Sequence, residues 1–481
     1  FDSDRKMMTT VHRDTVTEET IAFTKGAMDK ILGKCRSIRI NGQNRPIRPD
    51  DIEKIQQAAK KMAGDALRVL ALAINEEDQT ASETDLVFVG LVGMIDPPRP
   101  EARDAVSVFR KASVTTVMIT GDHKDTAFAI AKELGIADRE EQCITGDDLN
   151  NMTQEELNQA VPALRVFARV SPENKVMIVN AFKSHGDIVS MTGDGVNDAP
   201  SLKIADIGVA MGISGTDVAK GAADMVLTDD NFATIEKAIE EGRNIYNNIR
   251  KSVLFLLSSN LGEIVTMLVA IAAGLASPLK AIHILWVNLI TDSLPALALG
   301  VDPGDKDIMN EPPRNPRDSM FAKGGLAFMI VYGLAIGMVT LAAFLYSPIT
   351  HLLDSNLPVT LASIIDALGN EELLVHAQTY AFTTLAVTQL FNAIGVRNFH
   401  RSIFRFNHLN NRMMLLAIGA GFAMQVAVTE IPFLTNVFGT EELSLKEWFI
   451  LTGLATLPLW IHEFMVLGQV LRKKIYTKDA N

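Results

Sequence analysis

The sequence predicts a soluble region of mixed strands and helices, followed by an all-α bundle of six membrane helices. Apolar strand-like runs alternate with amphipathic segments between residues 86 and 228, whereas long apolar stretches occupy residues 253–468. The length of 481 residues also exceeds that of one ordinary domain, so we expect at least two domains.

Charge and cysteine content exclude several classes of protein. The formal net charge is −12 and no basic arm is present, which argues against a nucleic-acid-binding protein. Cys35 and Cys143 lie far apart, so they form no disulfide framework and fit a reducing cytoplasm. No signal peptide opens the chain, and FDSDRKMMTTV begins in the middle of a strand-like pattern. We therefore expect that the natural protein continues upstream.

Residues 1–84 are expected to form part of an α+β domain. The segment 19–32 reads as a strand, a turn at Gly26 and a helix. The segment 49–67 has proline and acidic residues at its front, as helix starts do, and the apolar run at 68–74 reads as a buried strand.

Residues 85–230 are expected to form a second, α/β domain. Strands are predicted at 86–95, 114–120, 164–170, 187–192, 207–211 and 224–228, mostly with helical segments between them. Near-continuous apolar strands that alternate with helices indicate a parallel sheet covered by helices.

Residues 231–274 predict one long helix. This segment has helical periodicity and no proline, with a charged first half and an apolar second half. At ~1.5 Å per residue it would be about 66 Å long, well beyond a bilayer core of ~30 Å. We therefore expect a cytoplasmic stalk at 231–252 that continues into the first membrane span.

Five further spans complete the predicted bundle. They are expected near 281–299, 324–346, 378–396, 413–431 and 448–468. No Lys or Arg occurs between Lys323 and Arg397, whereas the 397–412 loop carries four arginines. The positive-inside rule therefore places the soluble half, the 300–323 and 397–412 loops and the tail at 469–481 in the cytoplasm.

The loop after the strand at 187–192 has the composition of a magnesium site. Asp194, Asn197 and Asp198 follow that strand directly, and two glycines let the backbone bend. Ligands bind at the carboxyl ends of strands in open α/β sheets, and hard oxygen ligands beside a phosphate suit Mg²⁺. The alternative is a polar turn in which an aspartate caps a helix. It explains any one of these aspartates better than the whole string.

Two further loops supply candidate phosphate contacts. Thr120, Gly121 and Asp122 end a strand and precede a helix, where a hydroxyl and backbone N–H groups can cradle a phosphate. Arg169 and Lys175 flank the start of another helix and could neutralise phosphate oxygens. The alternative for both cations is ordinary solvated helix charge.

Lys25 and Arg68 are candidate nucleotide contacts in the first region. Lys25 lies between an apolar strand and a glycine turn, and Arg68 immediately precedes a buried strand. Both could face the phosphates or the base of a nucleotide, although composition alone favours a surface charge for each.

Ionisable side chains occur at membrane depth in the first two spans. Asn260 and Glu263 share one helix face, as do Asn288, Thr291 and Asp292. A charge at that depth costs ~2.5–3.5 kcal/mol on insertion scales and usually marks function. A proline three residues after the last aspartate is expected to disrupt the second span and free backbone carbonyls. Together these groups predict an all-oxygen cation site. Interhelical hydrogen bonding, the alternative, explains the amides and the hydroxyl better than the two acids.

These motifs closely resemble those of P-type ATPases, the ion pumps that form an aspartyl-phosphate. TGDGVNDAP is highly specific to that family, and KGA, DPPRP, MITGD and FARVSPENK occur in the family's order. SSNLGE and LWVNLITDSLPALALG look like the fifth and sixth helices of the type II, sarco/endoplasmic-reticulum-type calcium pumps. The resemblance covers essentially the whole chain. It implies a partial nucleotide-binding domain at 1–84, a haloacid-dehalogenase-like phosphorylation domain at 85–230, and helices five to ten at 253–468.

The resemblance also implies roles for individual residues. ATP would be contacted by Phe1, Lys6, Lys25 and Arg68. The phosphoryl group would be surrounded by Thr120, Gly121, Asp122, Arg169, Lys175 and Asn197. Mg²⁺ would be ligated by Asp194 with support from Asp198. Ca²⁺ would be bound by Asn260, Glu263, Asn288, Thr291 and Asp292.

Two departures from the family pattern carry consequences. The family's nucleophile lies in an Asp-Lys-Thr-Gly-Thr string, which this sequence lacks together with the actuator domain and the first four helices. We therefore expect no phosphoenzyme and no turnover from these 481 residues alone. Gln389 stands where the resembled pumps have a glutamate in the eighth helix, which predicts one bound Ca²⁺ rather than two.

We therefore expect the C-terminal portion of an ATP-driven calcium pump that is monomeric when full length. Its expected partners are ATP, Mg²⁺, Ca²⁺ and the lipid bilayer. Manganese, sodium, potassium and protons remain alternatives for the transported ion. A membrane-anchored phosphohydrolase would leave Glu263 and Asp292 unexplained, and a channel or carrier subunit would leave the loop aspartates unexplained. The missing signal peptide and the plain cytoplasmic loops favour a bacterial plasma membrane.

Overall fold

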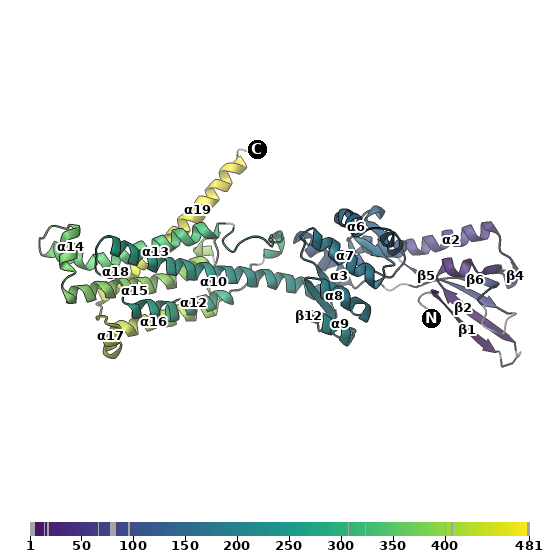
Figure 1. Ribbon diagram of the computed structural model, residues 1–481, viewed down its shortest axis with the longest axis horizontal. Coiled ribbons are helices and arrows are strands. Elements are labelled where there is room, and N and C mark those ends of the chain that lie inside the picture. The colour runs from purple at the N-terminus through teal and green to yellow at the C-terminus, as the bar shows by residue number, and fades with distance from the viewer. Residues whose placement is uncertain are drawn as a thin grey trace. The chain divides into compact units, whose positions relative to one another are not determined.

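The computed structural model divides into two compact units, and Figure 1 labels many of their elements. The first unit comprises Phe1–Ala238 with Met309–Pro313, and the second comprises Ile239–Ile308 with Arg314–Asn481. The structure describes residues 5–13, 15–16, 19–65, 67–76, 83–94, 97–305, 307–322, 324–399, 401–405 and 407–478. The predicted ATP contact Phe1 lies outside the described residues.

A six-stranded sheet organises the beginning of the first unit, with the strand order β1-β2-β5-β6-β3-β4. Its strands are β1 (Met7–Arg13), β2 (Thr20–Gly26), β3 (Cys35–Ile40), β4 (Gln43–Pro46), β5 (Arg68–Asn75) and β6 (Leu86–Met94). The helices beside it are α1 (Met28–Leu32) and α2 (Pro49–Gly64). Ile31 of α1 and Ile55 of α2 pack with Met7, Leu86 and Phe88 of the sheet in one buried core.

Strand β6 differs from its prediction. We expected the run at 86–95 to begin the alternating strand–helix region. Instead β6 pairs antiparallel with β5, from Arg68 opposite Met94 to Ile74 opposite Val87, and parallel with β3. The backbone of β6 is therefore committed to the first sheet. Hydrophobic pattern identified the strand but carried no information about which sheet it joins.

Two three-stranded parallel sheets follow, with the orders β7-β9-β8 and β10-β11-β12. Their strands are β7 (Met118–Ile119), β8 (Cys143–Thr145), β9 (Val166–Ala168), β10 (Ser190–Gly193), β11 (Ile207–Met211) and β12 (Met225–Leu227). The helices of this region are α3 (Pro100–Lys111), α4 (Lys124–Leu134), α5 (Gly146–Asn150), α6 (Gln154–Ala160), α7 (Pro172–Ser184), α8 (Ala199–Ile204) and α9 (Asp217–Ala222). Parallel pairing is confirmed, although several strands are shorter than predicted and β8 was not predicted.

The second unit is helical in the residues that the structure describes. Its helices are α10 (Ala233–Ala272), which starts in the first unit, α11 (Ala281–Trp286), α12 (Ser293–Gly300), α13 (Gly325–Asp354), α14 (Leu361–Ala367), α15 (Glu371–Val396), α16 (Arg412–Glu430), α17 (Pro432–Phe438), α18 (Leu445–Ala455) and α19 (Leu457–Lys478). The prediction of one long helix is confirmed by α10, whose 40 residues span about 60 Å.

Five helical stretches among the described residues are long and apolar enough to cross a membrane. They are Ala233–Ala272, Ala281–Gly300, Gly325–Asp354, Arg412–Glu430 and Leu445–Gly468. Helix α15, where we predicted a span at 378–396, is not among them. It carries many polar residues, such as Thr383, Thr388 and Gln389, and buries almost all of its side chains from Ala377 onward. Its composition is that of a helix surrounded by protein, where polar groups are better tolerated than in lipid.

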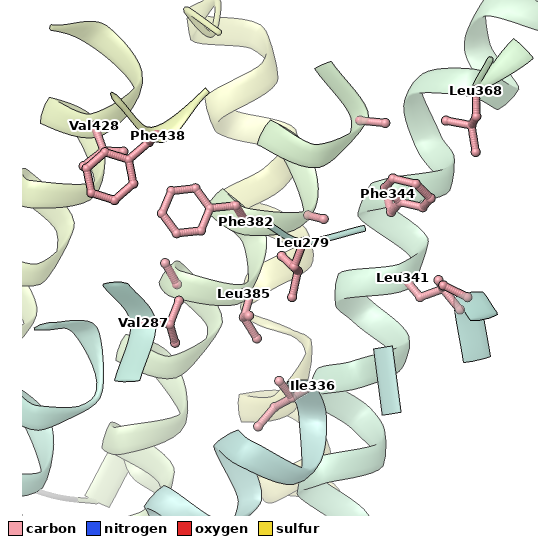
Figure 2. Packing of buried hydrophobic residues seen from close by; sticks show 14 of the residues in the cluster. Leu279, Val287, Ile336, Leu341, Phe344, Leu368, Phe382, Leu385, Val428 and Phe438 are labelled. Carbon is pink, nitrogen blue, oxygen red and sulfur yellow. The ribbon is translucent and has the colours of Figure 1, made fainter. Parts of the chain in front are cut away.

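The core of the second unit is packed around α15 (Figure 2). Phe382 and Leu385 of α15 lie between Val287 on one side and Ile336 and Phe344 of α13 on the other, and all five are fully buried or nearly so. Val287 begins the irregular segment between α11 and α12. Close packing of this kind holds the predicted cation ligands that follow Val287 in a defined position.

Candidate functional site

The loop after β10 is organised by Asp198. Its carboxylate Oδ2 accepts hydrogen bonds from the backbone N–H groups of Asp194 at 3.2 Å and Gly195 at 3.0 Å, and Lys175 Nζ donates to Oδ1. Asp198 is only 6% exposed. A Cβ added at Gly193 would lie 2.5 Å from the Cβ of Asp198, so glycine is required for this close approach.

The two aspartates of this loop have different electrostatic surroundings. Burial opposes ionisation of Asp198, but the ammonium of Lys175 and the two backbone donors outweigh it and hold the pKa of Asp198 below its ordinary value. Asp198 is therefore charged and fully engaged. Asp194 is exposed, while its backbone carbonyl accepts from the N–H of Thr216 at 2.9 Å. The loop is thus fixed while the Asp194 carboxylate stays accessible.

The oxygen ligands of this loop are of the kind that binds a magnesium ion. Asp194 and Asn197 are exposed oxygen ligands at the carboxyl end of a parallel strand, and Asp198 positions the backbone between them. The described residues contain no group of three or more His, Cys, Asp or Glu placed around a metal. Mg²⁺ commonly takes one or two protein carboxylates and keeps several of its waters, so Asp194 supplies an adequate protein anchor.

The loop after β7 is tied to the loop after β9. Thr120 N–H donates to the carbonyl of Phe167 at 2.9 Å, and Arg169 N–H donates to the carbonyl of Asp122 at 3.1 Å. The Thr120 hydroxyl donates to the Asp122 carboxylate and accepts from the Asp122 N–H, both at 3.1 Å. The structure therefore brings the Arg169 backbone beside the Thr120–Asp122 loop, with the Thr120 hydroxyl held by its own loop, and the role of these residues at a phosphate stays a prediction.

Helix α7 links these two loops to the Asp198 loop. Ser171 caps its N-terminus by accepting from Asn174 N–H at 3.3 Å. Arg169 precedes this cap and Lys175 follows it, where Lys175 reaches Asp198. The carboxyl ends of β7, β9 and β10 thereby contribute to one polar region, as expected for a phosphate site at strand ends.

The predicted nucleotide contacts lie on the first sheet. Met7 pairs with Gly26 at the junction of β1 and β2, and Ala27 N–H donates to the carbonyl of Lys6 at 3.0 Å, so Lys6 and Lys25 are near neighbours. Lys25 is opposite Leu72 of β5, whose exposed first residue is Arg68. Because residues at even spacing along a strand share a face, Arg68 and Lys25 lie on the same face of this sheet.

A cavity of about 360 Å³ lies in the first unit beside Arg169 and the start of α4. Its lining includes Asp29 of α1, Lys60 of α2, His123 and Asp125 at the start of α4, and Arg169. Arg169 also lies 3.9 Å from the Asp29 carboxylate. The lining contains Arg169 but not Lys6, Lys25 or Arg68, so the structure does not bring those three cations to this cavity.

The second group of predicted ligands surrounds a π-helical turn over Val287–Thr291. Asp292 N–H donates to the carbonyl of Val287 at 2.9 Å, five residues back. We expected the disruption near Pro295, but the irregular turn precedes that proline by about one helical turn. A π-helical turn widens the helix and often occurs at functional sites.

Carboxylates from two helices meet beside this turn. Asn288 Nδ2 donates to Glu263 of α10 at 3.2 Å and also to the carbonyl of Ile284 at 3.1 Å. Asp292 is fully buried, and its Oδ1 has no hydrogen-bond partner within the described part of the chain. Thr291 is buried as well and donates to the carbonyl of Val287. Asn260 is exposed, whereas the other four predicted ligands are buried or partly buried.

Sequence reasoning missed Ser259, which donates its hydroxyl to Asp292 Oδ2. Ser259 and Glu263 are four residues apart on α10 and therefore share a helix face, a spacing that could have revealed it. A carboxylate with one oxygen held by a serine and the other unpartnered is poised for a cation, since unsatisfied buried polar groups are costly.

A buried ionic cluster also escaped prediction. Asp302, after α12, is contacted by Lys251 of α10 at 3.2 Å, Arg397 at 2.8 Å and Asn411 Nδ2 at 2.9 Å. The side chains of Asp302 and Arg397 are 4% and 9% exposed. Lys251, Arg397 and Asn411 lie 51, 95 and 109 residues from Asp302 in the sequence, so no local spacing could have shown that they meet. The cluster fastens α10 to the ends of α12, α15 and α16.

Comparisons with known proteins identify the family of this chain. Residues 1–101 match the family model of the P-type ATPase cytoplasmic domain N, and residues 276–467 match that of the cation transporting ATPase C-terminus. The chain is 51% identical over 474 residues to calcium-transporting ATPase 1 of Bacillus cereus, which covers 98% of this chain and 53% of the relative. The chain belongs to the P-type ATPase family.

Other relatives of this P-type ATPase chain extend the comparison. Calcium-transporting ATPase of Bacillus subtilis is 42% identical over 480 residues, 98% of this chain and 51% of the relative. Human calcium-transporting ATPase type 2C member 1 is 37% identical over 477 residues, 99% of this chain and 49% of the relative. The family resemblance predicted from the motifs is confirmed, and it extends to type 2C relatives rather than to the sarco/endoplasmic-reticulum type in particular. The chain spans about half the length of these relatives.

Proposed function

We propose that this chain is the C-terminal portion of an ATP-driven calcium pump. The observation that carries the proposal is that α10 is hydrogen-bonded through Glu263 to Asn288 and through Ser259 to the buried Asp292, in helical stretches long and apolar enough to cross a membrane. The relatives named as calcium-transporting ATPases support the choice of ion. An anchored phosphohydrolase would have no use for two buried acids at that place.

The soluble half would carry out phosphoryl transfer. We assign residues up to Met94 to the nucleotide-binding domain, because β6 pairs within the first sheet, and the following residues to 230 to a haloacid-dehalogenase-like phosphorylation domain. The parallel strands with polar loops at their carboxyl ends support that assignment. The phosphorylated aspartate would belong to an Asp-Lys-Thr-Gly-Thr string outside the printed sequence.

The residues of this chain would bind and orient the reacting groups. Lys175 would offset negative charge on the phosphoryl group while remaining paired with Asp198, and Arg169 and the Thr120 loop would hold its oxygens. Asp194 would ligate Mg²⁺, with Asn197 beside it. When bound, Mg²⁺ supplies electrostatic stabilisation of the transferring phosphoryl group. The phosphates or base of ATP would be contacted by Phe1, Lys6, Lys25 and Arg68.

The membrane site would bind one cation through oxygen ligands. Glu263, Asn288 and Asp292 offer carboxylate and amide oxygens, Thr291 adds a hydroxyl, and Asn260 lies one turn from Glu263. Calcium accepts such a mixed and flexible set, and the absence of sulfur and imidazole disfavours copper or zinc. Gln389 supplies an amide in place of a carboxylate, which supports one Ca²⁺ per ATP.

The topology of the full pump follows from the helices and loop charges. We propose six spans in this chain, with α15 as the internal span that hydropathy alone does not detect. The positive-inside rule supports a cytoplasmic position for the arginine-rich 397–412 loop. The stalk at 231–252 and the tail at 469–481 would lie on the same side of the membrane. We further propose that the full-length protein works as a monomer in a bacterial plasma membrane.

Calcium uptake into vesicles tests the proposal. The full-length pump, reconstituted in proteoliposomes, should accumulate Ca²⁺ when supplied with ATP and Mg²⁺. Asp292→Asn should abolish calcium-activated phosphorylation, because the ligand charge is lost while the side-chain shape is kept. Wild-type calcium activation in Asp292→Asn would overturn the site. Activation by manganese, sodium or potassium but not by calcium would overturn the choice of ion.

A further inference from the structure

A histidine at the start of α15 joins two carboxylates from a distant part of the chain. His376 Nδ1 lies 3.0 Å from Glu441 Oε2, and His376 Nε2 lies 3.3 Å from Glu447 Oε1. Glu441 belongs to the turn before α18, and Glu447 lies in the first turn of α18. Both ring nitrogens of His376 thus face an acid.

The carboxylate of Glu447 and the backbone of Glu441 are held in place independently of the histidine. Tyr380 OH donates to Glu447 Oε1 at 2.7 Å, and the N–H and hydroxyl of Ser444 both donate to Glu447 Oε2 at 2.6 Å. Glu441 N–H donates to the hydroxyl of Thr379 at 3.1 Å. The Glu447 carboxylate is therefore fixed beside His376, Glu441 is fixed by its backbone, and the charge of the imidazole can change.

Protonation changes how many of these contacts the imidazole can make. A neutral imidazole has one N–H, so it donates to one carboxylate and turns a lone pair toward the other. An imidazolium donates a hydrogen bond from each ring nitrogen, and its positive charge attracts both carboxylates. Histidine is the side chain that makes this change near neutral pH.

We propose that His376, Glu441 and Glu447 form a proton-operated clasp between α15 and the turn that leads into α18. The clasp is closed when His376 is protonated and loosened when it is neutral. Its three side chains are between 24% and 38% exposed, so protons from the adjoining solution reach them.

Several other titratable groups lie on the elements around His376. They are Glu372 and Tyr380 on α15, Tyr346, His351 and Asp354 on α13, Lys280 before α11, Glu430 on α16, and Glu442 and Lys446 beside the turn. Carboxylates outnumber ammonium groups in this set.

The clasp is connected to the helices that carry the cation ligands. Gln378 Nε2 donates to the carbonyl of Ser277, between α10 and α11, at 2.8 Å. Lys280 Nζ donates to the carbonyl of Gly439, in the clasped turn, at 2.8 Å. The ends of α10 and α11 are therefore fastened to the same elements that His376 joins. This is a contiguous physical route between the clasp and Glu263 and Asn288.

The functional consequence rests on the proposed pump and its orientation. His376 is at the opposite end of α15 from the arginine-rich 397–412 loop, so it faces the compartment that receives the transported cation. An acidic receiving compartment would close the clasp, hold the ends of α10 and α11 against α15, and slow cation release. The device would make pumping sensitive to the pH of that compartment.

Hydrogen exchange of the full chain in detergent tests the clasp without requiring transport. The Glu441 and Ser444 amides should be about threefold to tenfold better protected near pH ~5.5 than near pH ~8, after correction for intrinsic exchange. His376→Gln should give low protection at both pH values, and His376→Lys, a permanent cation, should keep high protection at both. His351→Gln, an exposed histidine at the end of α13, serves as the matched control and should retain the wild-type pH dependence. Equal wild-type protection at both pH values, or pH dependence that survives in His376→Gln, would overturn the clasp.

Transport by the full-length pump tests the consequence separately. Uptake into proteoliposomes should be about threefold slower at an internal pH of ~5.5 than of ~8, with the external pH constant. His376→Gln should be fast at both internal pH values. If wild-type pump shows no ATP-driven uptake at all, the proposed function fails while the exchange result still decides the clasp. If uptake stays dependent on internal pH in His376→Gln, the clasp does not regulate release.

Discussion

Replacing Lys175 by methionine should destabilise the loop after β10, because the buried carboxylate of Asp198 would lose its cationic partner. Methionine keeps much of the lysine volume but leaves Asp198 Oδ1 without its ammonium donor. Removing one partner of a buried pair costs about 3–5 kcal/mol. The Lys175 side chain retains 21% exposure, so we expect the lower end of that range, about 3 kcal/mol.

Hydrogen exchange at the Asp194 and Gly195 amides measures this effect directly, because both donate to Asp198 Oδ2. A loss of about 3 kcal/mol corresponds to roughly a 100-fold to 200-fold loss of protection. The folded-state pKa of Asp198 is lowered, so its contribution is present above the unfolded value of about 3.9 and is lost as pH falls through the lower folded value. The difference between wild type and Lys175→Met should therefore be full at neutral pH and shrink in acid.

The same helix offers a matched control. Lys183 pairs with Asp206 at 3.1 Å, but these side chains are 34% and 29% exposed. Lys183→Met should consequently cost no more than about 1 kcal/mol. The double variant Lys175→Met/Asp198→Asn should recover much of the loss, since it removes the unpaired buried charge. Equal effects of Lys175→Met and Lys183→Met, or no coupling between Lys175 and Asp198, would refute the reasoning.

Three further substitutions test the sites. In the full-length pump, Asp194→Asn should remove the Mg²⁺ anchor and abolish phosphoenzyme formation from labelled ATP; a wild-type level would contradict the assignment. Gly193→Ala should destabilise the loop by about 1–3 kcal/mol in the same exchange assay, because its Cβ would lie 2.5 Å from that of Asp198, and unchanged protection would contradict this. Gln389→Ala should be mild where Asp292→Asn is inactivating, and two calcium ions occluded per phosphoenzyme would contradict the single-ion stoichiometry.

The sequence by itself determined the elements that depend on local pattern. Continuous helical periodicity without proline predicted α10, and the glycine-flanked aspartates after an apolar run predicted the loop after β10. The acids Glu263 and Asp292 were recognisable because a charge within an apolar segment is costly wherever that segment packs. Each of these inferences needs only neighbours in the chain.

Only the tertiary structure decided which groups from distant segments meet. The apolar pattern of β6 is the same whichever sheet it joins, and it pairs with β5 and β3. Asp198 and Asp194 look alike in the sequence, yet Lys175 engages the first and leaves the second accessible. Pairing of Asp302 with Arg397 and of His376 with Glu441 likewise depends on segments 65 or more residues apart. Periodicity describes the faces of an element, whereas the partner of each face is set by the free energy of packing the whole chain.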